Sequence, residues 1–142
     1  MKPFTMDSVL TYRQQLEDAA RQELFRALEQ KAGLRRQLRR VEDELTTLYR
    51  NLEQERKATT AQRLIMYERR IHIVRERLAR LEEEMDRQQE RVRQRRRHLL
   101  KASQERKVLE KLREQQNRNY RNHLNRKEAQ MLDEIAVLFH ER

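Results

Sequence analysis

The sequence of 142 residues lacks cysteine and tryptophan, and it contains only one glycine, one proline and 5% aromatic residues. Without cysteine, the chain has no disulfide framework, thiol nucleophile or cysteine metal site. Glycine and proline are too rare to supply the turns of a β-sandwich, a barrel or an α/β fold, which join many short elements. The composition therefore predicts an all-α protein built from a few long helices, in a single domain over residues 1–142.

Long apolar runs and motifs for catalysis are also missing. No run approaches the ~18 apolar residues of a membrane span, and residues 1–10 lack the apolar core of a secretory signal. The four histidines are scattered, and no phosphate loop or nucleophile with a base at a meaningful spacing is present. We therefore expect a cytoplasmic protein that does not insert into a membrane, is not an enzyme, and binds no cofactor or metal.

Positive charge is what the chain has in excess. Charged residues make up 41% of the sequence, with 34 Lys and Arg against 24 Asp and Glu, which gives a formal net charge of +10. Arginine supplies 27 of the 34 basic residues, and its guanidinium makes forked contacts with carboxylates and phosphates. The charge balance therefore indicates an acidic partner.

Apolar residues recur at alternating spacings of three and four, which is the period of a coiled coil. The first series of core positions comprises Ala20, Leu24, Ala27, Lys31, Leu34, Leu38, Val41, Leu45, Leu48 and Leu52. The second series comprises Leu64, Tyr67, Ile71, Val74, Leu78, Leu81, Met85, Gln88, Val92, Arg95 and Leu99. The two series predict one helix over about residues 5–57 and another over about 60–139, with a tight turn at 57–60 where the rhythm fails.

Short polar residues mark the predicted helix starts. Thr5 is the expected N-cap of the first helix, with Phe4 packed against Val9. Thr59 and Gln62 fit the capping-box pattern at the start of the second helix. The turn between the helices is then only a few residues long, so the chain is expected to fold back on itself.

Folding back at this turn matches the core positions of the two helices in antiparallel order. The predicted opposite pairs are Leu52 with Leu64, Leu48 with Tyr67, Leu45 with Ile71, Val41 with Val74, Leu38 with Leu78, Leu34 with Leu81 and Ala27 with Gln88. The basic span Arg91–Arg113 then lies opposite Asp7, Glu17, Asp18 and Glu23, and flanking charges of this kind select partner and direction. The sequence therefore predicts a long, monomeric two-helix antiparallel coiled-coil hairpin.

The second helix outruns the first. At ~1.5 Å per residue the helices are roughly 80 and 120 Å long, which leaves about 28 residues after Leu112 without an intramolecular neighbour. This overhang still carries an apolar stripe, formed by Leu112, Tyr120, Leu124, Met131, Ile135 and Leu138. Because such a stripe normally seeks another surface, the overhang is the first candidate for a partner-binding site.

A basic face on the second helix is a further candidate, and it leaves other function classes open. It comprises Arg91, Arg93, Arg96 and Arg97, within a span of ten basic and two acidic residues. Such a face attracts acidic proteins, or nucleic acid without sequence preference. Besides a hairpin that binds a partner, the alternatives are therefore a basic coiled-coil nucleic-acid-binding protein and a homodimeric structural coiled coil in which the break near residue 58 is only a stutter.

Several segments resemble the FliJ family of flagellar type III export proteins, which are small cytoplasmic antiparallel coiled coils. The resemblance is carried by residues 4–10 (FTMDSVL) with Arg13, 48–52 (LYRNL), 103–112 (SQERKVLEKL) and 133–136 (DEIA). It implies a non-enzymatic stalk whose terminal end engages a hexameric export ATPase and promotes its assembly or activity. The overhang described above suits that role. The related injectisome stalk proteins share the architecture and remain an alternative.

The resemblance also implies a second partner. Family members contact the cytosolic domain of the export-gate membrane protein through a face nearer the hairpin turn, and here that face comprises Tyr49, Tyr67 and Val74. Export chaperones are further possible partners, whereas specific binding of nucleic acid is not expected. The implied location is cytoplasmic, peripheral to the export apparatus of the inner membrane.

Overall fold

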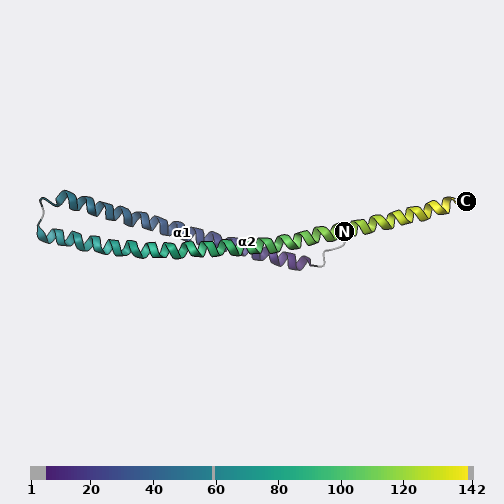
Figure 1. Ribbon diagram of the computed structural model, residues 1–142, viewed down its shortest axis with the longest axis horizontal. Helices are drawn as coiled ribbons and strands as arrows, with labels where there is room; N and C mark the ends of the chain where they lie inside the picture. The colour runs from purple at the N-terminus through teal and green to yellow at the C-terminus, as the bar shows by residue number, and fades with distance from the viewer. Residues whose placement is uncertain (1–5, 59, 141–142) are drawn as a thin grey trace. The chain divides into compact units, whose positions relative to one another are not determined.

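The computed structural model describes residues 6–58 and 60–140, and it shows two long helices. Helix α1 spans Asp7–Glu55 with 49 residues, and α2 spans Ala61–His140 with 80 residues. The described residues contain no strand. The two helices pack against each other in antiparallel order (Figure 1). The predicted all-α antiparallel hairpin is therefore confirmed, with helix bounds that differ from the prediction by one or two residues.

The turn between the helices is closed by hydrogen bonds of its own. The Ala58 N–H donates to the Glu55 carbonyl at 3.0 Å, which ends α1. The Thr60 hydroxyl accepts the Arg63 N–H at 3.4 Å, so Thr60 is the N-cap of α2. The N-cap is therefore Thr60 rather than the predicted Thr59. Because position N3 is then Arg63 and not Gln62, the cap is not a capping box. Thr59 itself, and the predicted Thr5 cap with Phe4, lie outside the described residues.

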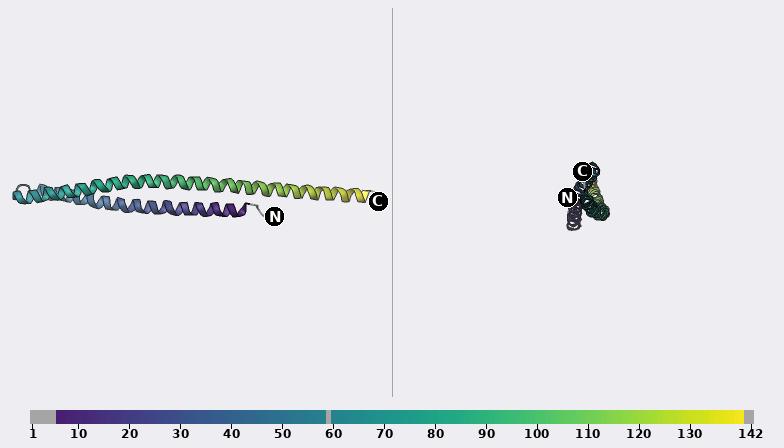
Figure 2. Two further views of the ribbon diagram at one scale, coloured as in Figure 1. Left: turned by 90° about the horizontal axis from the view of Figure 1, so that it is seen from below. Right: turned by 90° about the vertical axis from the view of Figure 1, so that its left-hand side faces the viewer.

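The chain divides into two compact units, and each is described by itself. The first comprises residues 21–98, which contain the turn and the two helix segments that it joins. The two segments lie side by side there (Figures 1 and 2). Its core is formed by Val41, Leu48, Ile71 and Val74, with Leu45, Leu52, Tyr67, Leu78 and Leu81 packed against it. All nine are core positions that the heptad spacing predicts. Arg95, which belongs to the same predicted series, is instead exposed and forms an ion pair with Glu23.

A buried hydrogen bond fixes the register of this unit. Gln88 is 3% exposed, and its side-chain amide donates to the backbone carbonyl of Ala27 at 2.9 Å and to the Gln30 side chain at 3.2 Å. Ala27 was the predicted opposite of Gln88, so the pairing is confirmed. A buried polar side chain at a core position specifies register at some cost in stability, because its partner lies at only one alignment.

We expect Gln88→Leu to raise the free energy of unfolding by about 1 kcal/mol, since it replaces a desolvated amide with an apolar side chain. Urea denaturation followed by circular dichroism measures the change. The control is Gln94→Leu, the same substitution at an exposed position, which should leave the unfolding free energy within about 0.5 kcal/mol of the parent. A marked loss of stability in Gln88→Leu would show that the hydrogen bonds of the amide stabilise the hairpin in addition to specifying its register.

The second unit comprises the described residues 6–20 and 99–140. Its core is small, with Leu10, Ala20, Ala102 and Leu109 each 8% exposed or less. Within this unit, α1 lies beside only the first part of the α2 segment 99–140. The rest of that segment continues past the start of α1 (Figure 2). The predicted C-terminal overhang is therefore present. That residues 1–142 act as one domain stays a prediction.

Candidate functional site

The overhang is the part of α2 that extends beyond the last contacts with α1. The outermost ion pair between described residues joins Arg113 to Asp7 at 4.0 Å. Every residue from 121 to 140 is exposed. Of the predicted stripe, Tyr120 is half-buried, and the five others are between 42% and 64% exposed: Leu112, Leu124, Met131, Ile135 and Leu138. The structure thus places five of the six residues beyond the last ion pair with α1, whereas Leu112 lies next to Arg113, which pairs with Asp7 at the start of α1.

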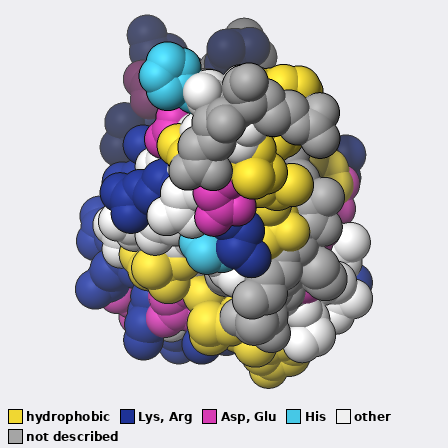
Figure 3. Space-filling model, turned by 90° about the vertical axis from the view of Figure 1, so that its right-hand side faces the viewer, with side chains coloured by type: hydrophobic (Ala, Val, Ile, Leu, Met, Phe, Trp, Pro, Cys, Tyr) yellow, Lys and Arg dark blue, Asp and Glu magenta, His cyan; other side chains and the backbone are white. Residues whose placement is uncertain are grey.

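The last turns of the overhang are more apolar than the predicted stripe. Leu132, Val137 and Phe139 are 66%, 56% and 71% exposed, and sequence reasoning missed them. Seven of the nine residues from 131 to 139 are apolar, a density that signals a broad face rather than a narrow seam. At about 100° per residue, Leu138, Met131, Ile135, Phe139 and Leu132 share one side of the helix. Figure 3 views this end, where hydrophobic side chains are exposed.

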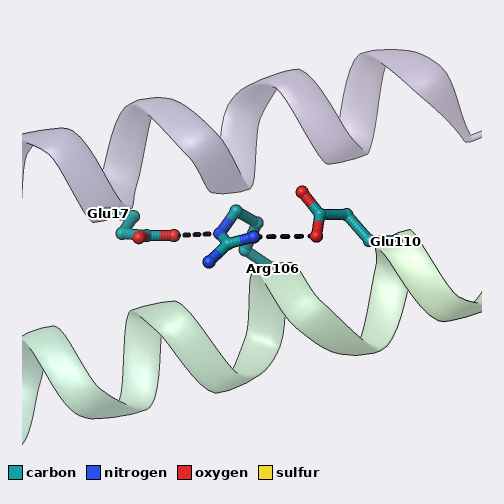
Figure 4. A network of polar contacts seen from close by, with 3 residues as sticks. All are labelled: Glu17, Arg106 and Glu110. Carbon is teal, nitrogen blue, oxygen red and sulfur yellow. Dashed lines mark hydrogen bonds and ion pairs between the residues drawn. The ribbon is translucent and has the colours of Figure 1, made fainter.

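An ion-pair network holds the base of the overhang against α1. Arg106 of α2 donates to the buried carboxylate of Glu17 on α1 and, at 2.8 Å, to Glu110 on its own helix (Figure 4). One turn away in α1, Arg13 donates to Glu105 at 2.5 Å. The predicted pairing of the basic span with Glu17 is therefore confirmed. Both links cross between the helices near the start of α1, and the Arg113–Asp7 pair lies still closer to the point at which α2 becomes free.

Arg106, at the centre of this network, keeps its positive charge near neutral pH. The hydrogen bonds that the Arg106 guanidinium donates, first to Glu17 and then to Glu110, raise its pKa above the ordinary value. A cation whose pKa is raised by folding stabilises the fold below its unfolded pKa, and this stabilisation is lost only as the pH rises through the folded pKa. For arginine that window is strongly alkaline. The arginine side of the network is therefore insensitive to pH near neutrality.

The predicted face near the turn is only partly available to a partner. Tyr49 is 41% exposed, and the Arg75 guanidinium lies over its ring, 5.9 Å from the centroid. Tyr67 is half-buried and packs against the core. Val74 is 2% exposed and belongs to the core, so it has no surface to offer a partner. Val74 was therefore wrongly predicted to contact a partner, because its heptad position places its side chain in the core.

Other apolar side chains near the turn are exposed, and sequence reasoning missed them. Ile65, Met66 and Ile73 of α2 are 49%, 68% and 54% exposed. All three are apolar residues at positions outside the heptad series. Such positions are expected to face away from α1, and this could have predicted that the three are exposed. Met66 lines a shallow hollow with Arg63, Tyr67 and Arg70, so apolar and cationic groups are mixed on this face.

The basic face on α2 is partly neutralised. Arg91, Arg93, Arg96 and Arg97 are all exposed. Glu90 accepts an ion pair from Arg93 at 3.5 Å and another from Arg97 at 3.3 Å. Arg91 instead donates to the Gln88 side chain at 3.4 Å. Close pairing lowers the field that this face presents, which favours short-range contacts with acidic side chains over long-range attraction.

The described residues offer neither a membrane span nor a cluster of metal ligands. None of the helices in the part of the chain that the structure describes is long and apolar enough to cross a membrane. Over residues 6–58 and 60–140, no three His, Cys, Asp or Glu side chains come together in a way that suits a metal ion. The surfaces that the structure does offer are an exposed apolar helix end, a mixed apolar and cationic face near the turn, and a basic face.

Comparison with known proteins identifies the family. The family model described as Flagellar FliJ protein matches residues 1–142, which is the whole chain. No curated protein and no solved structure matches. The family comprises non-enzymatic components of flagellar protein export. The predicted resemblance is thus confirmed over the full length, and the chain belongs to the FliJ family of flagellar proteins, with the export-related role that membership implies.

Proposed function

We propose that this protein is a stalk of the flagellar type III export apparatus, which binds the hexameric export ATPase through its overhang and promotes assembly or activity of the ring. The observation that supports this most is the apolar end of α2, residues 131–139, exposed on a helix that α1 does not cover. An exposed apolar helix face of this kind docks into a hydrophobic groove or collar of a partner.

The ion pairs at the base of the overhang support the mechanical part of the proposal. A stalk has to keep the helix end that binds the ATPase in a fixed direction relative to the rest of the hairpin. Arg106 and Arg13 tie α2 to α1 through Glu17 and Glu105, in the stretch of α2 that leads up to the Arg113–Asp7 pair and the overhang beyond it. Several linked charges are more rigid than an isolated surface pair, because ordering one side chain partly orders its neighbours.

The second contact that we propose is with the cytosolic domain of the export-gate membrane protein, through the face near the turn. Tyr49 offers an exposed aromatic ring, and Ile73 and Met66 add exposed apolar area on α2. Aromatic and apolar side chains among cations are typical of interface anchors. The basic face would meet acidic surfaces of these partners or of export chaperones. The location that fits is cytoplasmic, at the periphery of the inner-membrane export apparatus.

The test is to add the purified full-length chain to the cognate ATPase. We expect more hexamer by size-exclusion chromatography with light scattering and a higher rate of ATP hydrolysis, because a stalk bound along the ring axis contacts several subunits at once. Bovine serum albumin at equal mass serves as the control for non-specific protein effects. If neither the hexamer fraction nor the rate changes, the ATPase role is wrong.

The competing nucleic-acid role is tested in parallel. A salt titration against random duplex DNA separates a true binder, whose affinity is high and falls steeply with salt, from a merely basic protein. Binding that has vanished at physiological salt dismisses that role. The outcome we expect is weak binding, because Glu90 and Glu23 already pair with Arg93, Arg97 and Arg95 of the basic span.

A further inference from the structure

Charge is segregated along the overhang. Residues 115–127 contain four Lys and Arg and no acid, whereas residues 128–140 contain three acids and no Lys or Arg. The helix dipole does not explain this order, because it favours cations toward the C-terminal end of a helix. A helix that is basic in its first half and acidic in its second is complementary to an antiparallel copy of itself, and repels a parallel one.

The apolar residues of the overhang have the same two-way symmetry. Its seam comprises Tyr120, Leu124, Glu128, Met131, Ile135 and Leu138. In an antiparallel pair of overhangs, Tyr120 lies opposite Leu138 of the second copy, and Leu124 lies opposite its Ile135. In both pairs a large side chain meets another large side chain. A two-fold axis near residue 129 relates the two copies, so each pair occurs twice. Met131 then packs against the stems of Lys127 and Glu128 of the second copy.

The hairpin itself shows how charges pair beside such a seam. Ala27 lies opposite Gln88; Glu23, four residues before Ala27, forms an ion pair at 3.3 Å with Arg95, seven residues after Gln88. In the overhang, Tyr120 lies opposite Leu138 of the second copy; Glu134 lies four residues before Leu138, and Lys127 lies seven residues after Tyr120. The same offsets place Lys127 of each copy beside Glu134 of the other. The two-fold axis makes this pair twice.

From these features we infer that two copies of this chain associate in solution through antiparallel pairing of their overhangs, over residues 120–138, with reciprocal Lys127–Glu134 ion pairs. The hairpin of each copy is unchanged. The seam is only about 28 Å long and contains few large apolar pairs, so the dissociation constant is expected to be on the order of 10 to 100 µM. The chain is then a monomer when dilute and a dimer when concentrated.

This inference does not rest on the proposed function, and its test contains only the chain itself. Loss of ATPase binding would leave it standing, and absence of self-association would leave the ATPase role standing. If the overhang both pairs with a second copy and binds the ATPase, the second copy covers the same apolar face that the ATPase would bind. The two forms of association are then mutually exclusive. Self-pairing would then keep the apolar end covered until the ring displaces it.

The test is charge reversal, followed by sedimentation velocity at ~50 mM salt over about 1 to 300 µM protein. Glu134→Lys or Lys127→Glu alone replaces two attractive pairs with two repulsive ones, so each should weaken dimerisation about tenfold. The double variant Lys127→Glu/Glu134→Lys should restore the parent affinity. An equimolar mixture of the two single variants should form a heterodimer, because all four charges then match.

The chain offers a matched control for each change. Arg126 and Asp133 are the sequence neighbours of Lys127 and Glu134, but at about 100° per residue they lie on the opposite side of the helix from Met131. Arg126→Glu and Asp133→Lys should therefore leave dimerisation unchanged, although they alter net charge by the same amount. Equal weakening by neighbours and targets, or no association at the highest concentration, would overturn the inference.

Orientation is tested with cysteine, which the natural sequence lacks. Chains carrying Leu124→Cys and chains carrying Ile135→Cys are mixed in equal amounts and oxidised under mild conditions. Antiparallel pairing places these two positions opposite each other, so mixed disulfides should exceed either homodisulfide. A parallel dimer would instead favour both homodisulfides, and that result would contradict the proposed arrangement.

Discussion

Val74→Asp is expected to lower the free energy of unfolding by about 4 kcal/mol, a large fraction of the stability of a typical small protein. Val74 is 2% exposed and packs with Val41, Leu48 and Ile71. The substitution removes apolar contacts and buries a carboxylate for which that cluster offers no partner. Circular dichroism during thermal and urea denaturation would show the loss as a lower midpoint and less helix at 25 °C.

The neighbouring residue provides a sharp control for this result. Ile73 is 54% exposed, so Ile73→Asp places the same carboxylate in water and should change the unfolding free energy by no more than about 0.5 kcal/mol. The contrast between adjacent positions tests which side of α2 faces α1. Similar losses from both variants would mean that α2 is rotated relative to the arrangement described here.

The core and the register were predictable because they depend on a long repeat. Spacings of three and four run through the whole of residues 64–99, and only one side of a helix can follow them. The opposition of Gln88 to Ala27 follows from that repeat and the turn length, and the hydrogen bond between them confirms it. By contrast, two adjacent threonines precede α2, and their side chains alone do not decide which one caps the helix.

The candidate site was less predictable, for reasons that differ between its parts. The stripe from Leu112 to Leu138 could be found, because it continues the rhythm of the core. The exposed Leu132 and Phe139 lie beside that rhythm, and their availability depends on where α1 begins, which is a property of the folded chain. Val74 shows the opposite case, since its own heptad position predicts burial while the family resemblance implied a contact.

The individual ion pairs mark another limit of sequence reasoning. The pairing of a basic span with Glu17 and Glu23 was predictable from the antiparallel alignment. Glu17 pairs with Arg106 rather than with another arginine of the span. This choice depends on side-chain rotamers and on how far each flanking residue lies from the core positions. Glu44 pairs with both Arg70 and Arg77, at 3.9 and 3.7 Å, and no feature of the sequence distinguishes this arrangement from several others.

The other large effect is expected at the opposite end of α2. Ile135→Asp should weaken binding to the export ATPase by about 100-fold and abolish any stimulation of hydrolysis, because it puts a charge at the centre of the apolar face that we propose docks into the ring. Ile135 is 44% exposed and has no partner in α1, so helix content and the unfolding midpoint should be unchanged. Isothermal titration calorimetry and a coupled hydrolysis assay measure the two functional losses.

Val137→Asp is the matched control, since it makes the same change of a β-branched residue two positions away. Val137 is 56% exposed but lies, with Asp133, on the side of the helix away from Ile135. Its binding should stay within about threefold of the parent, because the new carboxylate joins an acidic side that remains in solvent. If both variants lose binding, the ring surrounds the whole helix end rather than gripping one face. If neither does, the overhang is not where the ATPase binds, and the ion pairs that hold it in place must serve a different contact.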